Sequence, residues 1–216
     1  MLKDVTFNNG EKSAYLDWNI VLTKAEIPLP KVKVITVDIM GADGVLDLSE
    51  VLTGDVKYDT RIAKLTFEAM DDSKFTELIS EIGNYLHGKM VTFTLSDDDE
   101  FYYVGRASIN DWECNRRKGK IVITVDCEPY KLENEDTVVM IPLTSTPTNY
   151  VLQNLRKQVC PIIIVSNNAT LVFDGYTYDL NNGTQQIIGV QFAEGDNLVS
   201  VSGSGTITFT YKRGAL

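Results

Sequence analysis

The amino-acid sequence predicts a mainly β protein with one helix, and three observations support this prediction. Apolar and polar residues alternate with a period of two in many short segments, as in a strand that buries one face. Asn-Gly and Asp-Gly pairs separate several of these segments, and such pairs supply the positive φ that tight hairpins require. One segment, 73–87, instead spaces its apolar residues three and four positions apart, which is typical of a helix.

The elements follow one another along the chain as short strands around this helix. Asp72 or Ser73 can cap the helix start, and Gly88 can end it. Strands are expected at 91–95, 121–125, 161–165, 171–173, 187–192, 198–201 and 206–211. Turns are expected at Asn9-Gly10, Asp43-Gly44, Asp174-Gly175, Asn182-Gly183, Gly195-Asp196 and Gly203-Ser204-Gly205.

The composition changes near residue 130 and predicts two domains. Charged residues are dense before this point, and an acidic run, prolines and a Ser/Thr-rich stretch follow it. Residues 1–130 are therefore expected to form one β domain, 131–148 a linker or crossing segment, and 149–216 a small β-sandwich.

The charge balance argues against a general nucleic-acid binder. The chain carries 30 acidic and 20 basic residues, for a net charge of -10. Residues 1–130 hold 23 of the acidic and 15 of the basic residues. Such a surface lacks the cations that release counterions from DNA, although DNA can slide past it without binding. No apolar run approaches the roughly 20 residues of a membrane helix, and no signal peptide is recognised.

No constellation of residues nominates an active site. The three cysteines, Cys114, Cys127 and Cys160, form no CxxC pair and are expected to be free and mostly buried. The single histidine, His87, falls at the predicted helix end, where a cation favours the helix dipole and can bond the last carbonyls. Residues distant in sequence can still meet His87 in the fold, but no catalytic, cofactor-binding or metal residue is nominated. The prediction is a protein that is not an enzyme.

A calcium-binding loop is one of two interpretations of segment 38–47. The segment holds three carboxylates and two glycines, but Met40 and Ala42 occupy positions that a calcium loop gives to oxygen ligands. A tight loop between two strands is therefore preferred here.

Two loops of opposite charge are the candidate contact sites. The acidic run Asp97, Asp98, Asp99 and Glu100 separates two predicted strands, as a solvated hairpin tip would. The basic run that begins with Arg116, Arg117 and Lys118 and continues to Lys120 is likewise expected to be a five-residue hairpin loop. We expect the two tips either to lie in solvent or to dock on each other between subunits.

Several stretches resemble the distal tail proteins of phages with long non-contractile tails. The first is 38–49, which contains a glycine, then Asp43-Gly44, then Leu46-Asp47-Leu48. It is followed, in the order of that family, by 52–54, Tyr58, 63–68, 105–107, 127–131 and 195–212. The resemblance covers most of the chain.

This resemblance implies a fold and an assembly. The first domain would be β-barrel-like with a helix at its side, and the second would be a galectin-like β-sandwich. Copies would close into a hexameric ring that continues the bore of the tail, through which DNA passes without specific binding. The ring would join the major tail tube protein to a tail-associated lysin, fibre or receptor-binding protein and support the host-adhesion apparatus. The location would be the virion tail of a phage or prophage, after synthesis in the host bacterial cytoplasm, with no membrane insertion.

Carbohydrate binding by an accessory protein of a host-adhesion device is the alternative function. Sugar sites often stack an aromatic ring on the sugar, but Trp18 and Trp112 both lie in the first part. The second part offers Phe173, Tyr176, Tyr178 and Phe192, which at alternating positions are expected to belong to the core. A hydrolase with a β-sandwich appendage is the weakest alternative.

Overall fold

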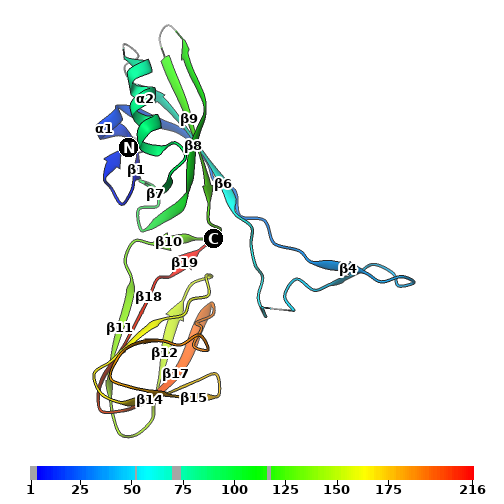
Figure 1. Ribbon diagram of the computed structural model, residues 1–216, viewed down its shortest axis with the longest axis vertical. Coiled ribbons are helices and arrows are strands. Elements are labelled where there is room, and N and C mark those ends of the chain that lie inside the picture. Colours follow the sequence, from blue (N-terminus) through cyan, green and yellow to red (C-terminus); the bar gives the residue numbers. More distant parts are fainter. Residues whose placement is uncertain (1–3, 52, 70–73, 116–117) are drawn as a thin grey trace. The chain divides into compact units, whose positions relative to one another are not determined.

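The computed structural model describes residues 4–51, 53–69, 74–115 and 118–216. The chain folds into two compact units, Met1–Lys131 and Leu132–Leu216. Both units are built mainly from antiparallel strands, as the alternating pattern predicts (Figure 1). No helix in the described ranges is long and apolar enough to cross a membrane.

The first unit contains one long sheet, two helices and a separate two-stranded ribbon. Its elements are β1 (Val5–Phe7), β2 (Lys12–Ser13), α1 (Ala14–Trp18), β3 (Ile20–Glu26), β4 (Thr36–Asp38), β5 (Val45–Asp47), β6 (Arg61–Ala69), α2 (Phe75–Leu86), β7 (Met90–Leu95), β8 (Phe101–Asn115) and β9 (Lys118–Cys127). The main sheet has the order β2-β1-β7-β8-β9-β6-β3. Among the described residues β2 and β3 do not pair with each other, so the sheet stays open and no closed barrel forms.

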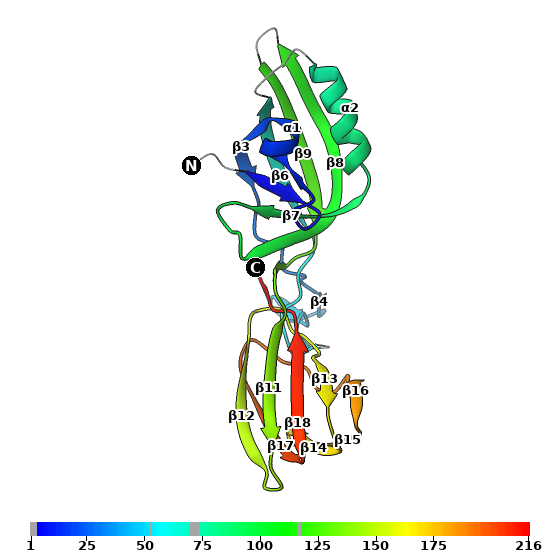
Figure 2. The same cartoon turned by 90° about the vertical axis from the view of Figure 1, so that its left-hand side faces the viewer.

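Helix α2 packs on this sheet through the face that its sequence spacing predicts. Phe75, Ile82 and Leu86 are buried, and the helix lies along β8 in both views (Figure 1, Figure 2). The helix ends at Leu86, and Gly88 adopts a φ of 77°, which favours glycine. The expected capping residues Asp72 and Ser73 lie outside the described residues.

Helix α1 was not predicted, because five residues are too few to show a helical period. Ser13 caps it, since its hydroxyl accepts a hydrogen bond from the Leu16 backbone N–H at 2.9 Å. Trp18, the last residue of α1, is buried in the core. Its indole N–H donates a hydrogen bond to the Glu81 carboxylate at 3.1 Å. A capped single turn thus anchors a tryptophan between β1 and α2.

The second unit is a β-sandwich. Its strands are β10 (Lys131–Glu133), β11 (Thr137–Leu143), β12 (Thr148–Asn154), β13 (Ile162–Val165), β14 (Ala169–Phe173), β15 (Tyr176–Leu180), β16 (Gly183–Gln186), β17 (Gly195–Gly203), β18 (Gly205–Tyr211) and β19 (Gly214–Ala215). Two four-stranded sheets, β11-β18-β13-β16 and β12-β17-β14-β15, enclose one core, and β10 pairs with β19. Both sheets supply that core, for example Phe209 from β18 and Val199 from β17.

Two features of this unit differ from the sequence-based expectations. The segment 131–148, expected as a linker, contains β11, a full sandwich strand whose Ile141 and Leu143 are buried. The strand expected at 187–192 is wrong. The Val190 N–H bonds the Ile187 carbonyl in a turn, and Phe192 makes an isolated bridge to Val159. The apolar residues of this segment reach the core from a loop. Their spacing in the sequence is the same as that of a buried strand, so the pattern alone does not separate the two.

Candidate functional site

The most exposed apolar surface of the first unit is an arm formed by residues 28–60. It leaves the main sheet after β3, forms the ribbon β4–β5 and returns to β6 (Figure 1). Hydrogen bonds close its base, where the Lys33 N–H bonds the Lys57 carbonyl and the Asp59 N–H bonds the Lys31 carbonyl, each at 2.8 Å. The arm is therefore a defined extension with a closed base.

The arm exposes apolar side chains along most of its length. They are Leu29, Val32, Val34, Ile35, Val37, Ile39, Met40, Val45, Leu46 and Val51. Val37 and Leu46 are cross-strand partners and therefore share one ribbon face. The pairs Thr36–Asp47 and Asp38–Val45 share the opposite face, which carries two carboxylates. One face of the ribbon is thus apolar and the other is mixed and acidic.

A two-stranded ribbon with both faces exposed is incomplete as a folded element. Isolated two-stranded ribbons are at best marginally stable in water, and the outer edge of each strand of this one pairs with no other described strand. A contiguous exposed apolar surface usually marks a site of protein–protein contact. The arm is accordingly the candidate interaction site of the first unit.

The arm tip is a hairpin turn, as preferred for segment 38–47. Gly44 has a φ of 77°, and the Ala42 N–H bonds the Ile39 carbonyl at 3.0 Å. The Asp47 carboxylate accepts hydrogen bonds from the backbone and hydroxyl of Ser49, which hold its pKa below the usual value. Within the described ranges, no group of three or more His, Cys, Asp or Glu side chains is arranged to hold a metal ion.

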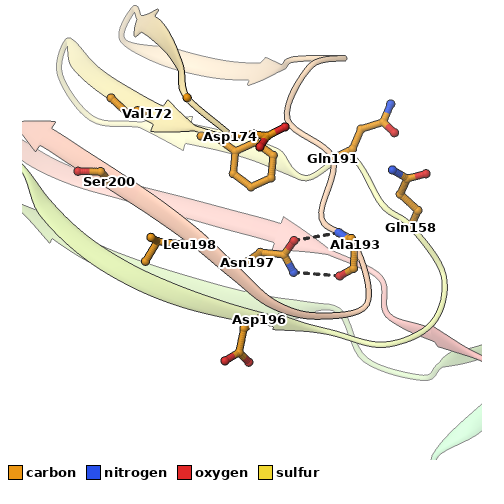
Figure 3. Close-up of a pocket in the computed structure, with 11 residues that line it drawn as sticks. Gln158, Val172, Asp174, Gln191, Ala193, Asp196, Asn197, Leu198 and Ser200 are labelled. Carbon is orange, nitrogen blue, oxygen red and sulfur yellow. Dashed lines mark hydrogen bonds between the residues drawn. The ribbon is translucent and has the colours of Figure 1, made fainter. Parts of the chain in front are cut away.

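The second candidate site is a pocket in the sandwich with a volume of about 600 Å³. Its lining comes from β14, β17 and the loops beside them, and it contains no Lys, Arg or His (Figure 3). The lining residues are Gln158, Val172, Phe173, Asp174, Gly175, Gln191, Ala193, Asp196, Asn197, Leu198 and Ser200. Carboxylates, amides and a hydroxyl thus stand beside an apolar wall.

Two buried asparagines hold the loop that forms one side of this pocket. The Asn197 side chain accepts a hydrogen bond from the Ala193 N–H at 2.9 Å and donates one to the Ala193 carbonyl (Figure 3). It also donates to the Gly195 carbonyl. Asn154 donates to the Phe192 carbonyl at 3.0 Å. These bonds hold segment 192–194, which precedes β17, so this side of the pocket is fixed by the protein's own hydrogen bonds.

The aromatic residues of the second unit follow the predicted pattern with one exception. Phe192 is fully buried, and Phe173 and Tyr178 are partly buried against the same core. Phe173 also lines the pocket, and its ring centroid lies 5.8 Å from that of Phe192. Tyr176, in contrast, is 66% exposed.

The acidic run occupies the connection between β7 and β8. Asp97, Asp99 and Glu100 are exposed, whereas Asp98 is half-buried. The Asp98 carboxylate accepts a hydrogen bond from the Lys131 ammonium at 2.6 Å, and that ammonium lies 4.4 Å from the centroid of the Phe101 ring. Asp98 is therefore engaged within its own unit.

The expected five-residue basic loop is wrong. β8 and β9 remain paired as far as Asn115 and Lys118, so Lys118, Gly119 and Lys120 belong to a strand. Lys120 pairs with Glu113 and Glu68 on its two sides, which places opposite charges on neighbouring strands. The predicted contact residues Arg116 and Arg117 lie outside the described residues.

His87 does not bond the last carbonyls of α2. Its Nδ1 accepts a hydrogen bond from the Ile109 backbone N–H at 3.1 Å. The predicted bond to the last helix carbonyls is thus replaced by a link between the end of α2 and β8.

The cysteines are free, but only one is fully buried. Cys127 is buried, Cys160 is half-buried and Cys114 is exposed. The expectation of mostly buried thiols therefore fails at Cys114, which sits on the far part of β8, where the strand leaves the core.

Sequence reasoning missed both candidate surfaces. The arm had a signal, since residues 32–37 are rich in β-branched side chains without strict alternation. The pocket had none, because its lining comes from distant segments that only the sandwich brings together.

Comparisons with known proteins identify the fold. No protein-family model matches the chain, and no curated protein matches it. Among solved structures, it is similar to SPP1 Dit (gp 19.1), described as a paradigm of the hub adsorption apparatus in phages that infect Gram-positive bacteria. The TM-score is 0.71 over 98% of this chain and 99% of that chain, with 16% sequence identity. The chain therefore has the fold of a Dit protein, which confirms the predicted fold class.

Proposed function

We propose that the chain is a phage distal tail protein: a structural, non-enzymatic component of the tail-tip hub that assembles into a ring. The fold shared with SPP1 Dit supports this role. The observation that carries the proposal is the arm, because its apolar side chains are exposed and its ribbon pairs with no other described strand.

A second copy of this chain is the partner that best fits the arm. The arm is one surface and the body of the first unit is another, so contact between copies is head-to-tail and repeats. A repeated contact of this kind closes into a ring when its rotation allows, and we propose the hexameric ring that the resemblance implies. The free edges of β4 and β5 can add strand pairing to the apolar contact.

The ring would place further partners on its two sides and DNA in its bore. We propose the major tail tube protein on one side and a tail-associated lysin, fibre or receptor-binding protein on the other. Acidic side chains of residues 1–130 would line the bore and repel DNA, so that DNA passes without binding. A ring structure with a basic lumen would contradict this part of the proposal.

The oligomeric state of the purified chain tests the proposal. Native mass spectrometry and negative-stain images over a range of concentrations should show rings of about six copies at high concentration and smaller species on dilution. A chain that stays monomeric at every concentration would argue against ring formation.

Two substitutions on the apolar face of the arm test whether the arm makes the contact between copies. Val37→Glu and Leu46→Glu should each leave the fold intact, because both side chains are exposed, and should prevent ring formation. Val138→Glu is the matched control, since Val138 is also an exposed valine on a strand, 60% exposed against 45% for Val37, and lies in the second unit. A loss of rings in all three variants would indicate a general solubility effect instead.

Binding of neutral sugars is the second candidate function, and the pocket favours it. Carboxylates, amides and hydroxyls beside an apolar wall suit the hydroxyl groups and the apolar face of a sugar ring. The absence of cationic side chains from the pocket lining makes an anionic ligand a poor fit.

Saturation-transfer NMR on the full chain tests this second candidate. Glucose, galactose and N-acetylglucosamine are the probes, and glycerol 3-phosphate is the anionic comparison. Asp174→Asn and Ser200→Ala should abolish transfer to a bound sugar, whereas Glu135→Gln, an exposed site outside the pocket lining, should not. Absence of transfer to all three sugars would refute sugar binding without affecting the ring proposal.

A further inference from the structure

Arg61 occupies a position that the sheet otherwise gives to apolar core residues. It is the first residue of β6, and alternate residues of a strand share one face. Ala63, Leu65 and Phe67 on that face are fully buried, and Arg61 itself is 4% exposed. The guanidinium of Arg61 therefore lies at the end of the row of core-facing side chains of β6, where the chain returns from the arm to the sheet.

Among the described residues, the surroundings of Arg61 provide an aromatic ring but no hydrogen-bond acceptor for two of its three guanidinium nitrogens. Its guanidinium carbon lies 4.9 Å from the centroid of the Tyr103 ring, and Cys127 is its cross-strand partner. Nε and Nη2 are sealed from solvent and have no acceptor among the described residues, whereas Nη1 is not among the sealed atoms.

This arrangement is unfavourable for the isolated chain. Burial lowers the pKa of Arg61, but an arginine side chain stays charged at any physiological pH. Taking such a charge out of water is costly unless an acceptor or counter-charge meets it, and a ring contact recovers only part of that cost. An acceptor that meets Nη1 from outside the described residues would offset part of this cost.

We propose that Arg61 receives a carboxylate from the arm of a neighbouring copy. This inference rests on the proposed ring. Three arm carboxylates, on Asp38, Asp43 and Glu50, make no hydrogen bond or ion pair among the described residues. The other arm carboxylates are engaged: Asp47 by Ser49, Asp55 by Lys57 and Asp59 by Lys33. Arg61 comes directly after the arm base in the chain. An arm that docks beside Arg61 therefore links the arm tip of one copy to the arm base of the next copy.

The first test removes the charge while keeping the volume of the side chain. Arg61→Met should keep or raise the thermal midpoint of the monomer, because a buried charge without an acceptor is lost. The same change should weaken ring assembly by about 30-fold or more in dissociation constant, as expected for loss of one partner from a buried charge pair. Lys64→Met, at an exposed cation of the same strand, is the control and should change neither property.

The outcomes separate this inference from the proposed function. Rings of unchanged dissociation constant in Arg61→Met would overturn the role of Arg61 and leave the ring intact. A large fall in the monomer's thermal midpoint would overturn it too, because Arg61 would then have an internal structural partner. A wild-type chain that never forms rings would remove the proposed function and this inference together.

A double-mutant cycle identifies the partner carboxylate. Asp38→Asn, Asp43→Asn and Glu50→Gln are each measured alone and combined with Arg61→Met. The substitution of the carboxylate that pairs with Arg61 should weaken assembly in the wild-type background. The same substitution should have little further effect in the Arg61→Met background. Additive effects of all three changes would refute an arm carboxylate as the partner.

Discussion

The ring of Phe75 lies so close to Gly119 that a Cβ at Gly119 would stand 2.2 Å from a ring carbon. Phe75 begins α2, and Gly119 lies in β9 near the far end of the sheet. The absence of a side chain at Gly119 therefore allows the first turn of α2 to pack directly on the β9 backbone. This contact lies in the paired part of β8 and β9 where a loop was expected.

Gly119→Ala should lower the free energy of unfolding by about 1–3 kcal/mol, because the added methyl group must displace the Phe75 ring. Gly83→Ala is the matched control, since Gly83 lies within α2 and a Cβ there meets nothing within 4 Å. The control should stabilise the chain by about 0.5–1 kcal/mol through helix propensity. Urea unfolding measures both values, and equal effects of the two changes would contradict the packing described.

Asn197→Ala should destabilise the second unit by about 1–3 kcal/mol, because it leaves the Ala193 N–H and two or more carbonyls of a buried loop without partners. Asn149→Ala, at an exposed position of β12 with no side-chain hydrogen bond among the described residues, should change the stability by less than about 0.5 kcal/mol. Thermal unfolding measures both variants. A stable Asn197→Ala variant would show that the loop is held by its backbone alone.

The three cysteines should react with iodoacetamide in the order of their exposure. Cys114 is exposed and should be alkylated first at neutral pH, and Cys160 should react more slowly. Cys127 should remain unmodified in the folded chain, since burial raises the pKa of its thiol to about 12. Peptide mass spectrometry over time gives the order, and early modification of Cys127 would contradict its burial.

The same thiol predicts a loss of stability in alkali. The pKa of Cys127 rises from 9.0 to about 12 on folding, so above pH 9 the unfolded chain releases a proton that the folded chain retains. This contribution to stability is complete below pH 9 and is lost as the pH rises toward 12. Burial also raises the pKa values of Tyr103 and Tyr211, which adds to the effect at higher pH. Cys127→Ala should therefore show a shallower fall of the unfolding free energy above pH 9 than the wild type, and parallel curves would refute this cause.

The ion pair of Asp98 and Lys131 should be stronger than an exposed pair. Its side chains are 29% and 19% exposed, respectively, whereas those of Lys74 and Glu77 are 78% and 77% exposed. Double-mutant cycles with alanine should give a coupling of about 1 kcal/mol for the first pair and about 0–0.5 kcal/mol for the second. Equal couplings would show that partial burial adds nothing to this pair.

The sequence predicted the regular parts of the fold because their spacing reflects burial. Helix α2 and strands β7, β14 and β18 lie where periodicity places them, since each buries one face. The turn at Asp174-Gly175 is equally local, because both residues adopt a positive φ. Short elements such as α1 carry too few residues to show a period.

The candidate sites were harder to predict because they depend on what the fold brings together. Arg61 appears in the sequence as an ordinary charged residue beside a strand, and only its register with Cys127 shows that it faces the core. The pocket likewise needs Gln158, Asp174 and Ser200 from three separate segments. His87 has a backbone partner in β8 that no pattern around residue 87 encodes.

In the proposed ring, the arm of one copy docks beside the arm base of the next copy, so assembly has a direction. An incomplete assembly then has one unoccupied arm at one end and one unoccupied base at the other, and growth continues at either end until they meet. A copy that lacks residues 34–48 could still receive an arm but would offer none. Such a copy would act as a chain terminator, and small amounts mixed with intact chains would suppress closed rings out of proportion to their number.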